Sequence, residues 1–126
     1  MELQPCWRFA WERIIRRCTD LDTHEYAVAL TLATFADPDG THIFPGTERL
    51  IRVTKAKRSK VLASLARLRS LGLVERVSEG RDKDSRYPFD EYRLTTPSDI
   101  FSRLSLLNPD DDDGTLEVHL MDLTTG

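Results

Sequence analysis

The chain has 126 residues, of which 40% are hydrophobic and 31% are charged. This length corresponds to one domain with a short appendage, and the composition excludes disordered and fibrous proteins. No run of about 18 apolar residues occurs, so we expect no membrane-spanning helix. The charged N-terminus lacks the apolar segment of a secretory signal. Two cysteines, Cys6 and Cys18, are too few for a disulfide framework, and we expect a cytoplasmic protein.

The formal net charge of −3 is distributed unevenly. Residues 1–47 hold four Lys or Arg against seven Asp or Glu, residues 48–93 hold thirteen against seven, and residues 94–126 hold one against seven. The three segments therefore carry −3, +6 and −6. A basic middle between acidic ends indicates a polyanion-binding segment with a tail that opposes or regulates it.

Two helices are predicted in the first third of the chain. Apolar residues recur at spacings of three and four over residues 7–18, which indicates an amphipathic helix. Residues 24–35 are apolar nearly all round, as in a central helix, and Asp37-Pro38-Asp39-Gly40 ends them with turn chemistry. We expect the first stripe to be core, and any exposed part of it to favour a dimer interface. The stripe consists of Trp7, Ala10, Trp11, Ile14, Ile15 and Cys18.

The rest of the chain alternates short helices and strands. A short extended piece over residues 41–44 precedes a third helix over residues 47–53 and a fourth from residue 57 or 58 to residue 71, where Gly72 ends it. Alternating residues predict antiparallel strands over 73–77 and 89–95, joined by a charged loop over 78–88. A helix over 99–107 and a possible strand over 115–124 follow, separated by the acidic run Asp110 to Asp113.

The stretch FPGTERLIRVTKAKRSKVLASLARLRSLGLVERV resembles the winged helix-turn-helix domains of bacterial, plasmid and phage DNA-binding proteins. The segment from Trp11 to Val77 is similar to a group common in actinobacteria and their mobile elements, and the resemblance covers residues 7–96. It implies an α+β, mainly helical fold with an extra N-terminal helix and a two-stranded wing. It divides the chain into a DNA-binding domain, 1–97, and an extension, 98–126, that holds a short helix and an acidic tail. The turn differs from the family pattern in carrying Lys55 and Ala56 where a glycine and a leucine or valine are usual, and Lys57 replaces the usual capping serine or threonine.

The basic residues at the start of the fourth helix point to the same function on physical grounds. Cations at a helix N-terminus oppose the helix dipole, whereas a base edge or a phosphate would make them favourable, and a helix fits the major groove. We expect Arg58, Lys60 and Ser64 to face bases and Lys57 and Arg67 to face phosphates. A solvated helix face is the alternative for this cluster. The remaining candidate DNA-binding residues are Thr47, Arg49, Arg52, Lys55 and Ser59, with Arg81, Lys83 and Arg86 in the wing.

These features predict a small, nucleoid-associated transcription regulator that binds double-stranded DNA, with a homodimer as the favoured oligomeric state. The alternatives are a replication or partition factor that binds origin repeats, and a winged helix used as a protein-interaction adaptor. The acidic tail is a solubiliser, a partner-binding peptide or an internal competitor for the basic face. The histidines and cysteines are too dispersed for a metal site, and no nucleotide-binding or catalytic motif occurs. We therefore expect no catalytic activity, no metal and no cofactor.

Overall fold

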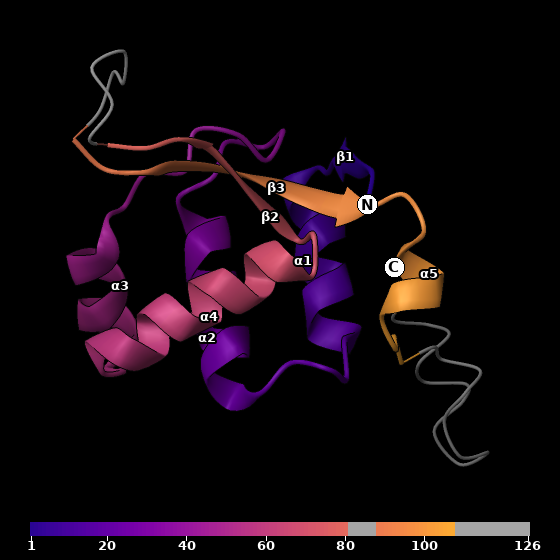
Figure 1. Ribbon diagram of the computed structural model, residues 1–126, viewed down its shortest axis with the longest axis horizontal. Helices are drawn as coiled ribbons and strands as arrows, with labels where there is room; N and C mark the ends of the chain where they lie inside the picture. Colours follow the sequence, from indigo (N-terminus) through magenta and orange to yellow (C-terminus); the bar gives the residue numbers. More distant parts are fainter. Residues whose placement is uncertain (81–87, 108–126) are drawn as a thin grey trace.

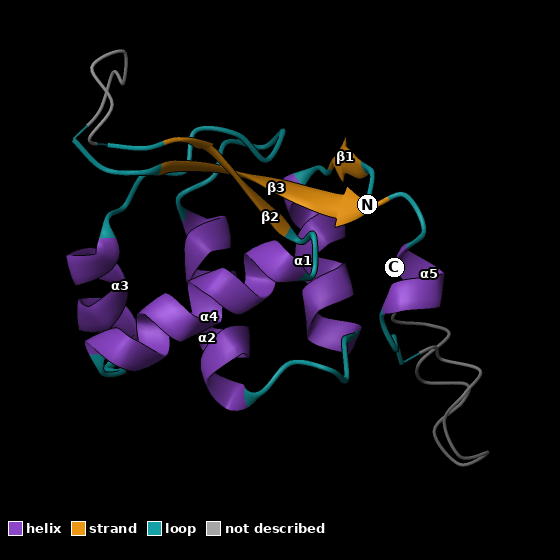
Figure 2. Ribbon diagram, in the orientation of Figure 1, coloured by secondary structure: helices purple, strands orange, loops and turns teal. Residues whose placement is uncertain are grey.

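Five helices and a three-stranded antiparallel sheet make up residues 1–80 and 88–107, the part of the chain that the computed structural model describes (Figure 1, Figure 2). The fold is α+β and mainly helical, as predicted. The sheet runs along one side of the helices, with α3 at one end of the molecule and α5 at the other (Figure 1). In chain order the elements are β1 (Leu3–Pro5), α1 (Arg8–Arg17), α2 (Thr23–Thr34), α3 (Thr47–Thr54), α4 (Arg58–Ser70), β2 (Val74–Ser78), β3 (Glu91–Pro97) and α5 (Ile100–Arg103).

The four helices predicted in residues 7–71 are confirmed, with bounds that agree within one residue, and local signals account for the start of α2 and the end of α4. An Asp22 and Glu25 capping box begins α2: the Glu25 N–H donates to the Asp22 carboxylate over 2.7 Å, and the Asp22 N–H donates to the Glu25 carboxylate over 3.0 Å. Gly72 follows α4 with a φ of 77°, a conformation that glycine adopts without strain.

Within the described residues the sheet has one strand more than the two predicted there, and the further strand suggested over residues 115–124 lies outside them. The additional strand, β1, pairs with β3, and the strand order is β1-β3-β2. Leu3 lies opposite Pro97, and Pro5 lies opposite Thr95. Three residues that include a proline show no alternation, so the pattern alone could not reveal this strand. Its place at the edge of the sheet tolerates the proline, which has no N–H to donate.

The predicted helix over residues 99–107 is wrong in its extent, because α5 covers only Ile100–Arg103. Leu104 is extended, with φ −125° and ψ 145°, and the chain then runs beside the end of α1. Leu106 pairs with Cys18 in an isolated bridge. Tertiary contacts with α1 therefore take the backbone groups that a longer helix would have used.

The Trp11 side chain connects α1 to the sheet through hydrogen bonds. Its side chain is fully buried, and its indole N–H donates to the carbonyl oxygens of Leu73 and Thr95 over 2.8 Å and 3.1 Å. Thr95 is buried as well, and its hydroxyl donates to the Gly72 carbonyl over 2.8 Å. These bonds satisfy the polar atoms that β2, β3 and α1 bring into the core.

The prediction that Trp7 belongs to the core is wrong. Helix α1 begins only at Arg8, and Trp7 is the extended residue before it, with φ −63° and ψ 145°. The helical spacing on which the prediction rested therefore does not apply at this position, and the Trp7 side chain is 68% exposed. Ala10 also lies on the surface, whereas Trp11, Ile15 and Cys18 are buried as expected.

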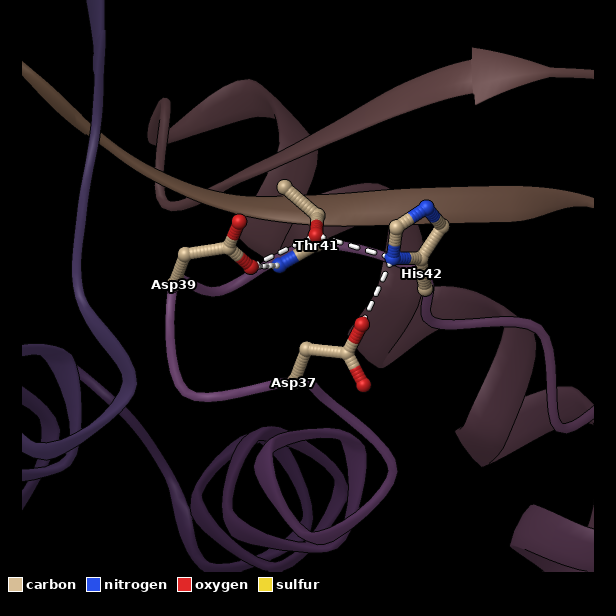
Figure 3. Close-up of polar contacts among 4 residues, drawn as sticks. All are labelled: Asp37, Asp39, Thr41 and His42. Carbon is tan, nitrogen blue, oxygen red and sulfur yellow. Dashed lines mark hydrogen bonds and ion pairs between the residues drawn. The ribbon is translucent and has the colours of Figure 1, made fainter.

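Polar contacts hold the turn that follows α2 (Figure 3). Asp37 contacts the His42 ring Nδ1 over 2.7 Å, and the Thr41 hydroxyl donates to Asp39 over 2.6 Å. This bond and a second one from the Thr41 N–H hold the pKa of Asp39 below its usual value. The turn places Ile43 beside β3, where Ile43 and Tyr92 exchange backbone hydrogen bonds of 3.2 Å and 2.7 Å.

Candidate nucleic-acid interface

A short turn joins α3 to α4 and sets the orientation of α4 relative to α3. Lys55 adopts the left-handed conformation, with φ 61° and ψ 15°, and its N–H donates to the Ile51 carbonyl over 2.9 Å. The Thr54 hydroxyl donates to the Leu50 carbonyl over 2.7 Å and accepts from the Ala56 N–H over 3.3 Å. A non-glycine residue in this conformation costs free energy, and the hydrogen bonds at both ends of the turn offset that cost.

Lys57 precedes α4 as its N-cap residue and makes no side-chain cap. Its backbone is extended, and its carbonyl accepts the N–H groups of Lys60 and Val61, each over 3.0 Å. The first turn of α4 contains no acidic residue. An uncapped helix N-terminus with basic side chains attracts anions, because the free N–H groups and the helix dipole both favour negative charge.

The segment 47–60 contains six basic residues and one acidic residue, and it lies at one end of the molecule (Figure 1). All six basic side chains are exposed. Arg58 pairs with Glu48 of α3. Among the residues that the structure describes, the other five form no ion pair with an acidic side chain. The six are Arg49, Arg52, Lys55, Lys57, Arg58 and Lys60.

The prediction that Ser64 belongs to the outer face of α4 is wrong. Ser64 is 3% exposed and lies on the same side of the helix as Val61, Leu65 and Leu68, which are buried. Residues spaced three and four apart share one face of a helix, so Ser64 sits inside the apolar stripe. Leu62 is apolar but lies outside this stripe and is 48% exposed.

The exposed face of α4 carries small residues in its centre. Ala63 and Ala66 lie opposite the buried stripe, and Ser59 and Ser70 continue the row at either end. Lys60 and Arg67, seven residues apart, flank this row on one side. Sequence reasoning assigned no role to Ala63 or Ala66, although a stripe centred on Val61, Ser64, Leu65 and Leu68 would have placed them opposite. We call Ser59, Ala63, Ala66 and Ser70 the small-residue face of α4.

The hairpin of β2 and β3 points to the end of the molecule where α3 lies (Figure 1). Arg76 of β2 pairs with Glu79 over 2.8 Å and with Asp90 over 3.6 Å, and the Gly80 N–H donates to the Asp90 carboxylate over 3.0 Å. The predicted wing residues Arg81, Lys83 and Arg86 lie outside the described residues.

A cavity of about 490 Å³ separates the start of α3 from the base of the hairpin. Thr47 lines it together with Gly46, which has a φ of 78°. On the hairpin side it is lined by Phe89 and Tyr92, and by the Arg76 cluster described above. Burial is the main cause that raises the pKa of the Tyr92 hydroxyl. The two carboxylates beside Arg76 offset its charge, so the DNA contact expected of Thr47 receives no support from neighbouring cations in this cavity.

No protein-family model matches the chain, and comparison with curated proteins and with solved structures finds no match either. Within residues 1–80 and 88–107, no helix has the length and apolar character needed to cross a membrane. The same residues contain no group of three or more His, Cys, Asp or Glu side chains placed to hold a metal ion.

Proposed function

We propose that this chain is a winged helix-turn-helix protein that binds double-stranded DNA and acts as a small transcription regulator. In this assignment α3 and α4 are the two helices of the motif, α4 is the recognition helix, and the β2–β3 hairpin is the wing. The observation that carries the proposal is the exposed face of α4, where Lys60 and Arg67 border a row of small residues and the helix begins without a cap.

The small-residue face suits close approach to base pairs. The major groove is about 12 Å wide, and an α-helix with its side chains is about 10–12 Å across. Small side chains in the centre let the helix enter deeply, and the Ala63 and Ala66 methyl groups can contact thymine methyl groups. The flanking Lys60 and Arg67 then face the phosphates that border the groove. Lys60 therefore contacts a phosphate in this proposal, rather than the base expected from the sequence.

Arg58 is the side chain in the first turn of α4 that can specify a base. Its guanidinium offers a planar pair of donors that matches the O6 and N7 atoms of guanine. Lys57 and Lys55 are point charges that suit phosphates. Arg49 and Arg52, one turn apart on α3, extend the basic surface beside them. Phosphate contacts position the protein, and Arg58 with the small-residue face selects the sequence.

Helix stability alone does not account for the charges at this end of α4. Lysine at the N-cap and in the first turn is unfavourable for the helix dipole, typically by about 0.3–1 kcal/mol per charge. Replacing Lys57 and Lys60 with glutamate is therefore expected to stabilise α4. A loss of DNA binding in the Lys57→Glu/Lys60→Glu variant could not then come from unfolding.

The test is the affinity of the intact chain for duplex DNA, with two double charge reversals compared. Lys57→Glu/Lys60→Glu is expected to lower affinity at least about tenfold, since two phosphate contacts are replaced by repulsion. Arg13→Glu/Arg16→Glu changes the net charge by the same amount on exposed residues of α1 and is the matched control. Affinity in the control is expected to stay within about twofold of the original. Equal losses in both variants would show that only net charge matters and would contradict a localised interface.

A further inference from the structure

The cavity between the start of α3 and the base of the β2–β3 hairpin has no role in the DNA contacts proposed above. Its volume of about 490 Å³ lies within the range of small-molecule sites, about 300–1,000 Å³. Its walls come from three parts of the chain: Leu50 of α3, Leu65 of α4, and Arg76 and Tyr92 of the two hairpin strands. Segments far apart in the sequence thus enclose a space of the size that a small organic molecule fills.

The inner end of the cavity is apolar. Leu50 and Leu65 line it and are buried, whereas Phe89 lines it and is exposed, so Phe89 lies nearer the mouth. The Phe89 ring packs directly on Gly46, since a Cβ atom added to Gly46 would lie only 2.8 Å from the nearest ring carbon. The ring is therefore held against the start of α3, and it gives the cavity a fixed aromatic wall.

The polar wall of the cavity carries an excess of negative charge. Among the described residues that line the cavity, Arg76 is the one cation, and Glu79 and Asp90 are the two anions. Arg76 pairs with Glu79 over 2.8 Å, whereas its nearest distance to Asp90, 3.6 Å, is too long for a hydrogen bond. One guanidinium thus faces two carboxylates, and one negative charge is left uncompensated by the described lining residues.

Asp90 has one carboxylate oxygen that can accept a stronger donor. Its Oδ1 accepts the Gly80 N–H over 3.0 Å. Its Oδ2 has two long contacts from described residues, with the Tyr92 hydroxyl at 3.4 Å and with Arg76 at 3.6 Å. Ordinary hydrogen bonds to oxygen are about 2.5–3.2 Å long, and each carboxylate oxygen accepts about two of them. A donor in the cavity would therefore bind Oδ2 without displacing a short hydrogen bond from a described residue.

These walls determine the chemical class of a ligand. A cation would compensate the excess charge, and a planar group with paired N–H donors suits a carboxylate best. Aromatic rings attract cations at their faces, and the leucines of the inner end favour an apolar body. The start of α3 has no side-chain cap and by itself favours an anion. An anion would also meet the Glu79 and Asp90 carboxylates, so the cation is the better match.

We propose that this cavity binds a small organic cation with a flat apolar body, an aromatic amidine or amine. The cationic group binds the Asp90 and Glu79 carboxylates, and the apolar body packs against Phe89 and Leu50. The site uses side chains of the hairpin base and the inner side of α3, none of which is among the basic residues proposed to contact DNA. Ligand binding is therefore independent of the proposed DNA binding.

Three probes of nearly equal shape test the site: benzamidine is cationic at neutral pH, benzamide is neutral and benzoate is anionic. Each is titrated into the intact chain, and the amide NMR signals of Gly46, Thr47, Gly80 and Phe89 report binding at the cavity. We expect saturable shifts with benzamidine and an affinity about five- to tenfold above that of benzamide, from two partly exposed carboxylates. Benzoate should bind most weakly. Tighter binding of benzoate, equal affinities for the three probes, or no saturable shift at these amides would each overturn the assignment.

Two single substitutions on the same strand and just beyond it separate the cavity from a general effect of charge. Glu79→Gln removes one of the two carboxylates and should weaken benzamidine about two- to fivefold while leaving benzamide unchanged. Glu75→Gln is the matched control, because Glu75 pairs with Arg93 and does not line the cavity, and it should change neither affinity. Equal losses of benzamidine affinity in both variants, or a loss of benzamide affinity in Glu79→Gln, would contradict the contact. None of these outcomes depends on whether the protein binds DNA.

Discussion

Glu48 of α3 pairs with Arg58 in the first turn of α4. The pair spans the turn between the two helices. It joins the one acidic residue of the segment 47–60 to Arg58, the side chain proposed to contact a base. In the DNA-free protein Arg58 is therefore already engaged, and binding to a base requires this exposed ion pair to open.

Replacing Glu48 with glutamine is expected to tighten DNA binding about three- to tenfold. The substitution removes a negative charge from the interface and releases Arg58. Folding should change little, because exposed ion pairs contribute about 0–1 kcal/mol. Duplex affinity and urea denaturation measure the two effects. Glu12→Gln, which removes the partner of Arg8 on α1, is the matched control and should leave affinity unchanged. Weaker binding by Glu48→Gln would mean that the pair organises Arg58 rather than occupying it.

The small-residue face predicts opposite results at neighbouring positions of α4. Ala63→Glu places a carboxylate in the centre of the face, and we expect DNA affinity to fall at least about tenfold. The unfolding free energy should stay within about 0.5 kcal/mol, because the site is exposed and glutamate is a good helix former. Ser64→Ala alters a buried residue and should leave DNA affinity unchanged. An affinity that depends on Ser64 and not on Ala63 would contradict the orientation of α4.

The two tryptophans should differ sharply in their contribution to folding. Trp11→Phe removes a buried indole N–H that donates to the Leu73 and Thr95 carbonyls, and the Leu73 carbonyl then keeps only the Thr95 N–H as a donor. We expect a loss of about 2–4 kcal/mol in the unfolding free energy, from the lost packing and the lost hydrogen bonds. Trp7→Phe is the control and should cost less than about 0.5 kcal/mol, since that side chain is exposed. Urea denaturation of both variants measures the difference, and similar costs would contradict the burial of Trp11.

Burial raises the pKa of the Cys18 and Cys6 thiols. Because the thiolate is the reactive form, both should react slowly with a disulfide reagent near pH 8 while the protein is folded, and rapidly in urea. The same shift predicts that stability falls at high pH. Below the ordinary thiol pKa of about 8.5 the contribution to folding is complete, and it is lost as pH rises through the higher folded values. A Cys6→Ala/Cys18→Ala variant should lose less stability than the original chain between about pH 8.5 and 10. Equal losses would exclude a thiol contribution.

The four helices of residues 7–71 could be predicted from the sequence because their apolar residues form helical patterns, and the Asp22 capping box and Gly72 mark the start of α2 and the end of α4. The strand β1 could not, since three residues carry no pattern and their pairing with β3 depends on contacts about ninety residues away, as between Leu3 and Pro97. In the same way α5 is cut short by the pairing of Leu106 with Cys18, which no local signal announces.

The candidate site was predictable in composition and less so in orientation. The excess of basic residues around Lys57 pointed to the start of α4 as the candidate site. The burial of Ser64 was missed because a serine in an apolar stripe is assigned to the surface by polarity, whereas the spacing of Val61, Leu65 and Leu68 places it inside. The core prediction for Trp7 is wrong for a related reason. Helical spacing was applied to residue 7, whereas α1 begins at Arg8. Spacing decides orientation only after the helix bounds are known.

The central claim is that the α3–α4 basic residues bind duplex DNA, and the dependence of affinity on salt tests it most directly. Each neutralised phosphate contributes a slope of about −0.9 to the logarithm of affinity against the logarithm of salt concentration. For contacts from most of the six basic residues of the segment 47–60, we predict a slope of about −4 to −5 for the intact chain. Lys57→Glu/Lys60→Glu should reduce its magnitude by about 2. A slope near zero, or one that this variant does not change, would contradict DNA binding through this surface.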